Sequence, residues 1–180
     1  MKDGATILVP YDFSPHSVFA LQTAADLARA VSGRIHLLHV VEEPSVTYPS
    51  IATGVVTEGG IPVGVLEHAR AALEEVGAGL QLEHPPAIAT RVVEASSAAA
   101  GIVAFAEEIA ADLIVMGTHG RTGMGHAFLG SVAERTLRQA ECPVLTLKDG
   151  AELDPDPETA DSDQTSDQTS DQTREGATSD

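Results

Sequence analysis

A cluster of glycines follows a short apolar run in the second half of the chain. The run is residues 113–116, and glycines stand at positions 117, 120, 123, 125 and 130, the last followed by Ser131. Glycine at this density leaves backbone N–H groups uncovered, so an anion can approach them closely. The spacing of Ser131 and Glu134 is that of a capping box, which predicts a helix start at the Gly130–Ser131 step. A buried strand, a glycine-rich turn and a helix N-terminus in this order predict a cradle for phosphate.

The spacing within this segment is G-x2-G-x9-G-S, from Gly117 through Gly120 to Gly130 and Ser131. It is neither a Walker A loop nor the G-x-G-x-x-G dinucleotide fingerprint. Glycines after a strand most often only turn the chain, so the turn alone leaves the ligand open. Arg121 could neutralise phosphate charge, although a single arginine in a turn is more often solvated.

Apolar runs and helical patterns alternate along the chain. We expect strands at 5–10, 34–41, 90–95, 113–116 and 144–147, and helices at about 15–31, 65–76, 98–109 and 131–140. Ser14 followed by Pro15 is a helix start, Gly77 is a C-terminal signal, and Gly101 weakens its helix by about 1 kcal/mol. The alternation predicts an α/β fold: a doubly wound five-stranded parallel sheet of order 3-2-1-4-5 with helices on both faces. Its switch point would bring Asp12 and the Gly117 turn to one crevice.

Three polar residues near strand ends have ordinary and functional interpretations. Asp12 either caps a backbone N–H in a turn or lies at the ligand-binding edge of the sheet. His36 and His39 are three apart in a strand and point to opposite faces, which argues against a shared metal site, so we assign no metal. Residues 43–64 form a connection rich in Gly, Pro, Ser and Thr, which is either a mobile covering loop near the ligand or disordered.

The composition indicates one domain followed by a tail. Hydrophobic residues make up 43% of the 180-residue chain and aromatic residues 3%, so the core must consist of Val, Ile, Leu and Ala. No apolar run is long enough to span a membrane, and the N-terminus lacks a signal-peptide pattern, so we expect a cytoplasmic protein. Because Cys142 is the single cysteine of the chain, an intrachain disulfide is excluded. We interpret Cys142 as a buried, inert thiol. Residues 149–180 contain SDQT three times and are expected to be disordered.

The charge is strongly negative throughout. Residues 149–180 carry eleven of the 27 acids and one of the ten bases, a charge of −10 that leaves −7 of the total −17 for residues 1–148. Such a surface repels nucleic acid and anionic membranes, so neither is expected as a partner. It is also typical of a protein from a high-salt cytoplasm.

Residues 4–148 resemble the universal stress protein family. The resemblance rests on G-x2-G-x9-G-S together with the segments ILVPYDFS, LLHVVEE, ADLIVMGTHGRTG and LGSVAERTLRQAECPVLTLK. It implies the same 3-2-1-4-5 sandwich, with ATP bound at the switch point. Whether magnesium or manganese accompanies the nucleotide is left open by the sequence. It also implies a homodimer formed by the last strands, here residues 144–148.

The resemblance also implies a set of binding residues. Pro10, Tyr11 and Asp12 would line the adenosine side, and Val40 would meet adenine through its backbone. Met116 and Gly117 would approach the ribose. His119, which by itself is more often a surface turn histidine, would lie with Gly120 in the phosphate turn. The phosphates would lie at Gly130, Ser131, Val132 and Ala133, of which Ala133 departs from the hydroxyl residue often found there.

Three functions remain open at this level. The favoured one is a dimeric ATP-binding module of the stress response. A slow ATPase or phosphotransferase would use the same pocket, but the sequence shows no paired carboxylates, P-loop lysine or arginine finger beside the glycines. We therefore assign no catalytic residue. A nucleotide-free interaction protein is the third candidate.

Overall fold

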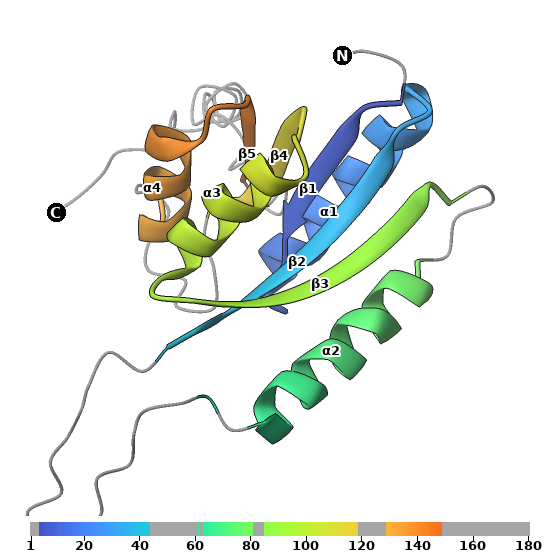
Figure 1. Cartoon of the computed structure of the whole chain (residues 1–180). Helices are drawn as coiled ribbons and strands as arrows, with labels where there is room; N and C mark the ends of the chain where they lie inside the picture. The colour runs from blue at the N-terminus through green and yellow to red at the C-terminus, as the bar shows by residue number, and fades with distance from the viewer. Residues whose placement is uncertain (1–3, 44–60, 62, 81–84, 119–128, 149–180) are drawn as a thin grey trace, which may run out of the picture. The chain divides into compact units, whose positions relative to one another are not determined.

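A five-stranded parallel sheet with strand order β3-β2-β1-β4-β5 organises the chain (Figure 1). The computed structural model describes residues 4–43, 61, 63–80, 85–118 and 129–148. Division by internal contacts gives two units, Met1–Asp149 and Gly150–Asp180, and every described residue belongs to the first. The expected fold class and strand order are confirmed.

The helices and strands alternate as expected, with small differences at their ends. Thr6–Pro10 (β1), Arg34–Glu42 (β2), Ala87–Ala95 (β3), Leu113–Gly117 (β4) and Val144–Leu147 (β5) are the strands. The helices are Pro15–Ala30 (α1), Val63–Ala78 (α2), Ala98–Glu108 (α3) and Ser131–Gln139 (α4). No helix in the described part of the chain is long and apolar enough to cross a membrane.

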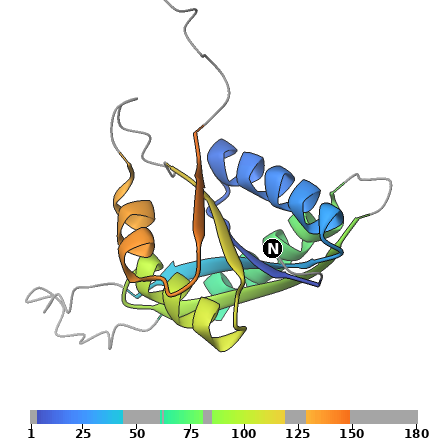
Figure 2. The same ribbon diagram turned by 90° about the horizontal axis from the view of Figure 1, so that it is seen from above.

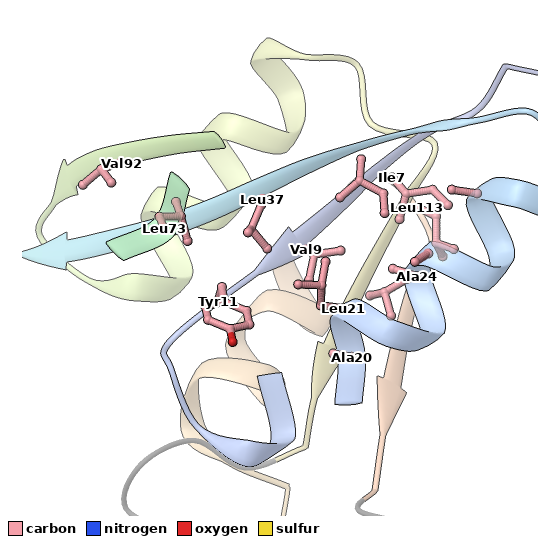
Figure 3. Close-up of a cluster of buried hydrophobic side chains, with 14 of the residues drawn as sticks. Ile7, Val9, Tyr11, Ala20, Leu21, Ala24, Leu37, Leu73, Val92 and Leu113 are labelled. Atoms are coloured by element: carbon pink, nitrogen blue, oxygen red, sulfur yellow. The ribbon is translucent and has the colours of Figure 1, made fainter. Parts of the chain in front are cut away.

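Two buried clusters hold the helices against the sheet. The first lies between the sheet and helices α1 and α2, and contains Ile7, Val9, Leu37 and Leu73 together with the small buried residues of α1 (Figure 3). The second lies on the other face beneath α3 and α4, which pack beside each other (Figure 2). Because alternate residues of a strand point to opposite faces, Leu8 joins the second cluster while its neighbours join the first. The expected core of Val, Ile, Leu and Ala is confirmed.

Side-chain caps fix two of the helix starts. The hydroxyl of Ser14 accepts a hydrogen bond of 3.3 Å from the N–H of Ser17, with Pro15 at the first helical position, as the sequence predicts. Ser97 caps α3 in the same way. At the amino ends of the strands, the Asp112 carboxylate accepts a 2.9 Å hydrogen bond from the N–H of Thr6, which joins β4 to β1.

Two expectations about the middle of the chain need correction. Helix α2 does not end before Gly77 but runs through it to Ala78. A Cβ at Gly77 would lie 3.1 Å from Cγ2 of Thr90, so this glycine allows close packing of α2 on β3. Strand β3 starts at Ala87, three residues earlier than expected, because its register with β2 begins at Arg34. Most of the expected covering loop, residues 44–60 and 62, lies outside the described residues. The predicted tail, residues 149–180, also lies outside them.

Candidate functional site

The candidate site lies at the carboxyl edge of the sheet, where β1 ends between its neighbours β2 and β4. Strand β1 pairs with β2 through Pro10, opposite Leu38, and the N–H of Tyr11 adds one more hydrogen bond, of 2.7 Å, to the carbonyl of Leu38. Strand β2 continues beyond this point to Glu42, paired there only with β3. The end of β1 therefore leaves a gap beside the last residues of β2, at the switch point of the strand order.

The backbone of Val40 faces this gap. In a parallel ladder a residue directs its N–H and C=O to the same neighbouring strand, and the residue two positions along does likewise. Leu38 bonds to β1, so Val40 directs both groups to the β1 side. Among the described residues, no hydrogen bond joins these groups to the turn that follows β1. One donor and one acceptor are thus available side by side.

The start of α4 returns to the end of β4. The N–H of Gly130 donates a 2.7 Å hydrogen bond to the carbonyl of Thr118, and the N–H of Thr118 donates one of 2.9 Å to Leu147 on β5. Gly130 is the N-cap of α4 and makes no side-chain cap hydrogen bond. Ser131 is the first helical residue, so the expected capping box with Ser131 as the cap is wrong.

Three N–H groups at this helix start have no protein acceptor within the described ranges. They belong to Ser131, Val132 and Ala133, whereas the next N–H, of Glu134, donates to Gly130 at 2.9 Å. Ser131 is exposed, and the side chain of Ala133 is buried in the second cluster, so Ala133 could reach a ligand only through its backbone. Unbonded N–H groups and the positive end of the helix dipole together attract an anion.

The turn between β1 and α1 is built around Asp12. One carboxylate oxygen of Asp12 accepts hydrogen bonds from the N–H of Ser14 at 3.1 Å and from its hydroxyl at 2.5 Å. Asp12 thus caps a backbone N–H in the turn, the first of the two roles considered for it from the sequence. Phe13 between them has a φ of 65°, which is unusual for a residue other than glycine. The carboxylate of Asp12 is therefore held at the carboxyl edge, beside the gap left by β1.

An aromatic cluster that the sequence did not reveal joins this turn to β2. Nδ1 of His39 lies 2.7 Å from the carbonyl oxygen of Tyr11, so Nδ1 carries the proton and donates. The ring of Phe13 stands edge-on to Tyr11 at 5.2 Å and to His39 at 5.0 Å between centroids. Burial, and then the negative charge of Asp12, raise the pKa of the Tyr11 hydroxyl. The cluster fixes the backbone on both sides of the gap.

The structure brings most of the expected binding residues to this edge. The residues so gathered are Pro10, Tyr11, Asp12, Val40, Met116, Gly117, Gly130, Ser131, Val132 and Ala133. Met116 is buried in the second cluster and Gly117 is half-buried at the end of β4. His119, Gly120 and Arg121 lie outside the described residues.

Two other features of the described residues bear on ligand binding. No group of three or more His, Cys, Asp or Glu side chains among them could hold a metal ion, and His36 and His39 lie on opposite faces as expected. A hollow of about 680 Å³ lies at the amino ends of β2 and β3, lined by residues such as Arg29, Gly33 and Pro86. This hollow is open to solvent and lies at the opposite end of the strands from the carboxyl edge. Parallel α/β sheets bind their ligands at the carboxyl edge, so the hollow is not the candidate site.

The fold and this edge define a doubly wound α/β domain with an anion-receptive helix start at its switch point. The sequence profile of the Universal stress protein family matches residues 5–148, and the chain belongs to that family. The resemblance inferred from the motifs is thereby confirmed.

Individual relatives agree with this assignment. Universal stress protein MJ0531 of Methanocaldococcus jannaschii is 37% identical over 146 residues, which cover 79% of this chain and 81% of the relative. Universal stress protein YxiE of Bacillus subtilis is 30% identical over 148 residues, covering 79% and 97%. Among solved structures, MJ0577 has a TM-score of 0.63 at 26% identity, covering 80% of this chain and 95% of that one. A universal stress protein solved in complex with cAMP shares the fold, with a TM-score of 0.53 at 22% identity, covering 81% and 98%.

Proposed function

We propose that this chain is an ATP-binding universal stress protein, a module of the stress response in which nucleotide is bound rather than turned over. The observation that carries the proposal is the start of α4. Its three N–H groups that lack an acceptor in the described ranges lie at the end of β4, next to the end of β1, and can donate to phosphate oxygens. The dipole of the helix adds to the attraction for a triphosphate.

The backbone of Val40 supports adenine as the base. Adenine presents an amino group that donates and a ring nitrogen that accepts, which complements one C=O and one N–H on the same strand edge. Guanine presents the reverse pattern at the corresponding positions, an O6 acceptor and an N1–H donor. A gap with these two groups on one side therefore favours adenine over guanine.

The remaining roles follow from the carboxyl edge. Pro10, Tyr11 and Asp12 would line the adenosine side, and Met116 and Gly117 the ribose. His119 and Gly120, outside the described residues, would complete the phosphate turn. A magnesium or manganese ion would accompany the nucleotide through its phosphate oxygens.

Dimerisation belongs to the same proposal. Strand β5 is the edge of the sheet, and Val144, Leu145 and Leu147 on it are only half-buried. An apolar edge strand with one side unpaired is suited to pairing with a second copy through residues 144–148. A cytoplasmic location, the domain boundary at residue 148 and a disordered acidic tail are proposed with it.

Released nucleotide tests the proposal directly. Protein purified from cells is denatured, and the supernatant is analysed for ATP and ADP by chromatography, followed by calorimetry of the apo protein with ATP. The double variant Gly117→Val/Gly120→Val should lose ATP binding and remain a folded dimer by light scattering. Gly64→Ala, at a helical position with open space around it, is the matched control. No nucleotide in the purified protein, together with no calorimetric binding near millimolar ATP, would refute the function.

A further inference from the structure

Helix α3 lies unusually close to the end of β2, and a glycine makes this possible. A Cβ placed on Gly101 would lie 2.8 Å from Cγ1 and 3.1 Å from Cγ2 of Val40, and 3.0 Å from Cβ of Ala95. A real Cβ essentially never comes within 2.8 Å of another heavy atom, and contacts of 3.0 and 3.1 Å are unusually tight, so any larger residue forces α3 or Val40 to move. Glycine inside a helix costs about 1 kcal/mol relative to alanine, so this position weakens α3 in return for the close approach.

Two hydrogen bonds hold the residues that follow Val40, one to α3 and one to the end of β3. A carboxylate oxygen of Glu42 accepts a 2.6 Å hydrogen bond from the N–H of Ala98, the first residue of α3. The N–H of Glu43 donates one of 2.9 Å to the carbonyl of Ala95. Beyond the end of β1, the last residues of β2 are therefore held in place by β3 and by the first turns of α3.

We propose that Gly101 is a positioning residue for the nucleotide base, acting through Val40. The proposal rests on the function proposed above. The side chain of Val40 packs against α3, while its N–H and C=O face the gap beside β1. A shift of the Val40 side chain thus moves the two groups that select adenine. The phosphate-binding N–H groups belong to a different helix, α4, which packs beside α3.

Gly101→Ala is the test, with affinity measured separately for ATP and for inorganic tripolyphosphate by competition against a fluorescent ATP analogue. We expect ATP to bind about tenfold more weakly, the loss of one well-placed hydrogen bond, and tripolyphosphate to change less than about twofold. The preference for ATP over GTP should narrow. The 13C-methyl signals of Val40 should shift in the nucleotide-free variant.

Two further variants separate positioning from a general effect on folding. Gly64→Ala also replaces a helical glycine, in open space, and should leave both affinities unchanged. Val40→Ala combined with Gly101→Ala removes both methyl groups of residue 40, at 2.8 and 3.1 Å from the added Cβ, while keeping its backbone and leaving the 3.0 Å contact with Ala95. It should restore most of the ATP affinity.

The outcomes distinguish this inference from the function on which it rests. Normal ATP binding by Gly101→Ala, or an equal loss of ATP and tripolyphosphate binding, would overturn the positioning role and leave the proposed function standing. A wild-type protein that binds no ATP would overturn both.

Discussion

The use of backbone N–H groups at the start of α4 can be tested by removing one of them. Ser131 is the first helical residue, and proline is tolerated there because the N–H at this position has no partner within the helix. Gly130 before it has φ of −61° and ψ of 148°, a conformation compatible with a following proline. Helix α1 already begins with Pro15. Ser131→Pro should therefore keep the fold and delete one donor.

The expected loss follows from the strength of a hydrogen bond to a charged phosphate. Such a bond contributes about 1.5–3 kcal/mol, so Ser131→Pro should weaken ATP binding about 10- to 100-fold. Calorimetry at fixed salt measures the affinity, and thermal unfolding should shift by less than about 4 °C. Ser131→Ala is the control that removes the hydroxyl and keeps the N–H. Ser131→Pro should weaken the binding of tripolyphosphate by the same factor as that of ATP, whereas Gly101→Ala should weaken the binding of ATP alone. A folded Ser131→Pro protein that binds ATP as wild type does would refute phosphate binding through this N–H.

Three further predictions concern stability. Thr136 is completely buried and its hydroxyl has no hydrogen-bond partner among the described residues, so Thr136→Val should stabilise the protein by about 1 kcal/mol in urea unfolding; destabilisation would contradict this. Burial, and then the charge of Arg34, lower the pKa of His36, so the unfolded chain takes up the proton first as pH falls below about 6.5. Stability is then lost with falling pH, and His36→Gln should show a smaller drop in melting temperature between about pH 7 and 5; an unchanged drop would exclude His36. The acidic charge predicts a melting temperature that rises from low to molar KCl, and a flat profile would argue against adaptation to high salt.

Local sequence determined the elements and their order. Continuous apolar runs such as residues 113–116 suit strands of a sheet covered on both faces, and the alternation with helical patterns leaves few topologies for the chain. Ser14 followed by Pro15 started α1 as expected, because a cap requires only neighbouring residues. The glycine spacing and the start of α4 near Ser131 were also local, although the identity of the N-cap was not.

Tertiary structure decided what the carboxyl edge offers to a ligand. Val40 has an ordinary core-strand sequence, and its backbone is available only because β1 ends earlier than β2. His39 meets the carbonyl of Tyr11 across two strands, and nothing near either residue in the sequence indicates that contact. From the sequence, Gly101 only weakens its helix, and the close approach to Val40 that requires a glycine is visible only in the structure. Such features depend on distances between segments that are far apart in the chain, and no local pattern of residues records those distances.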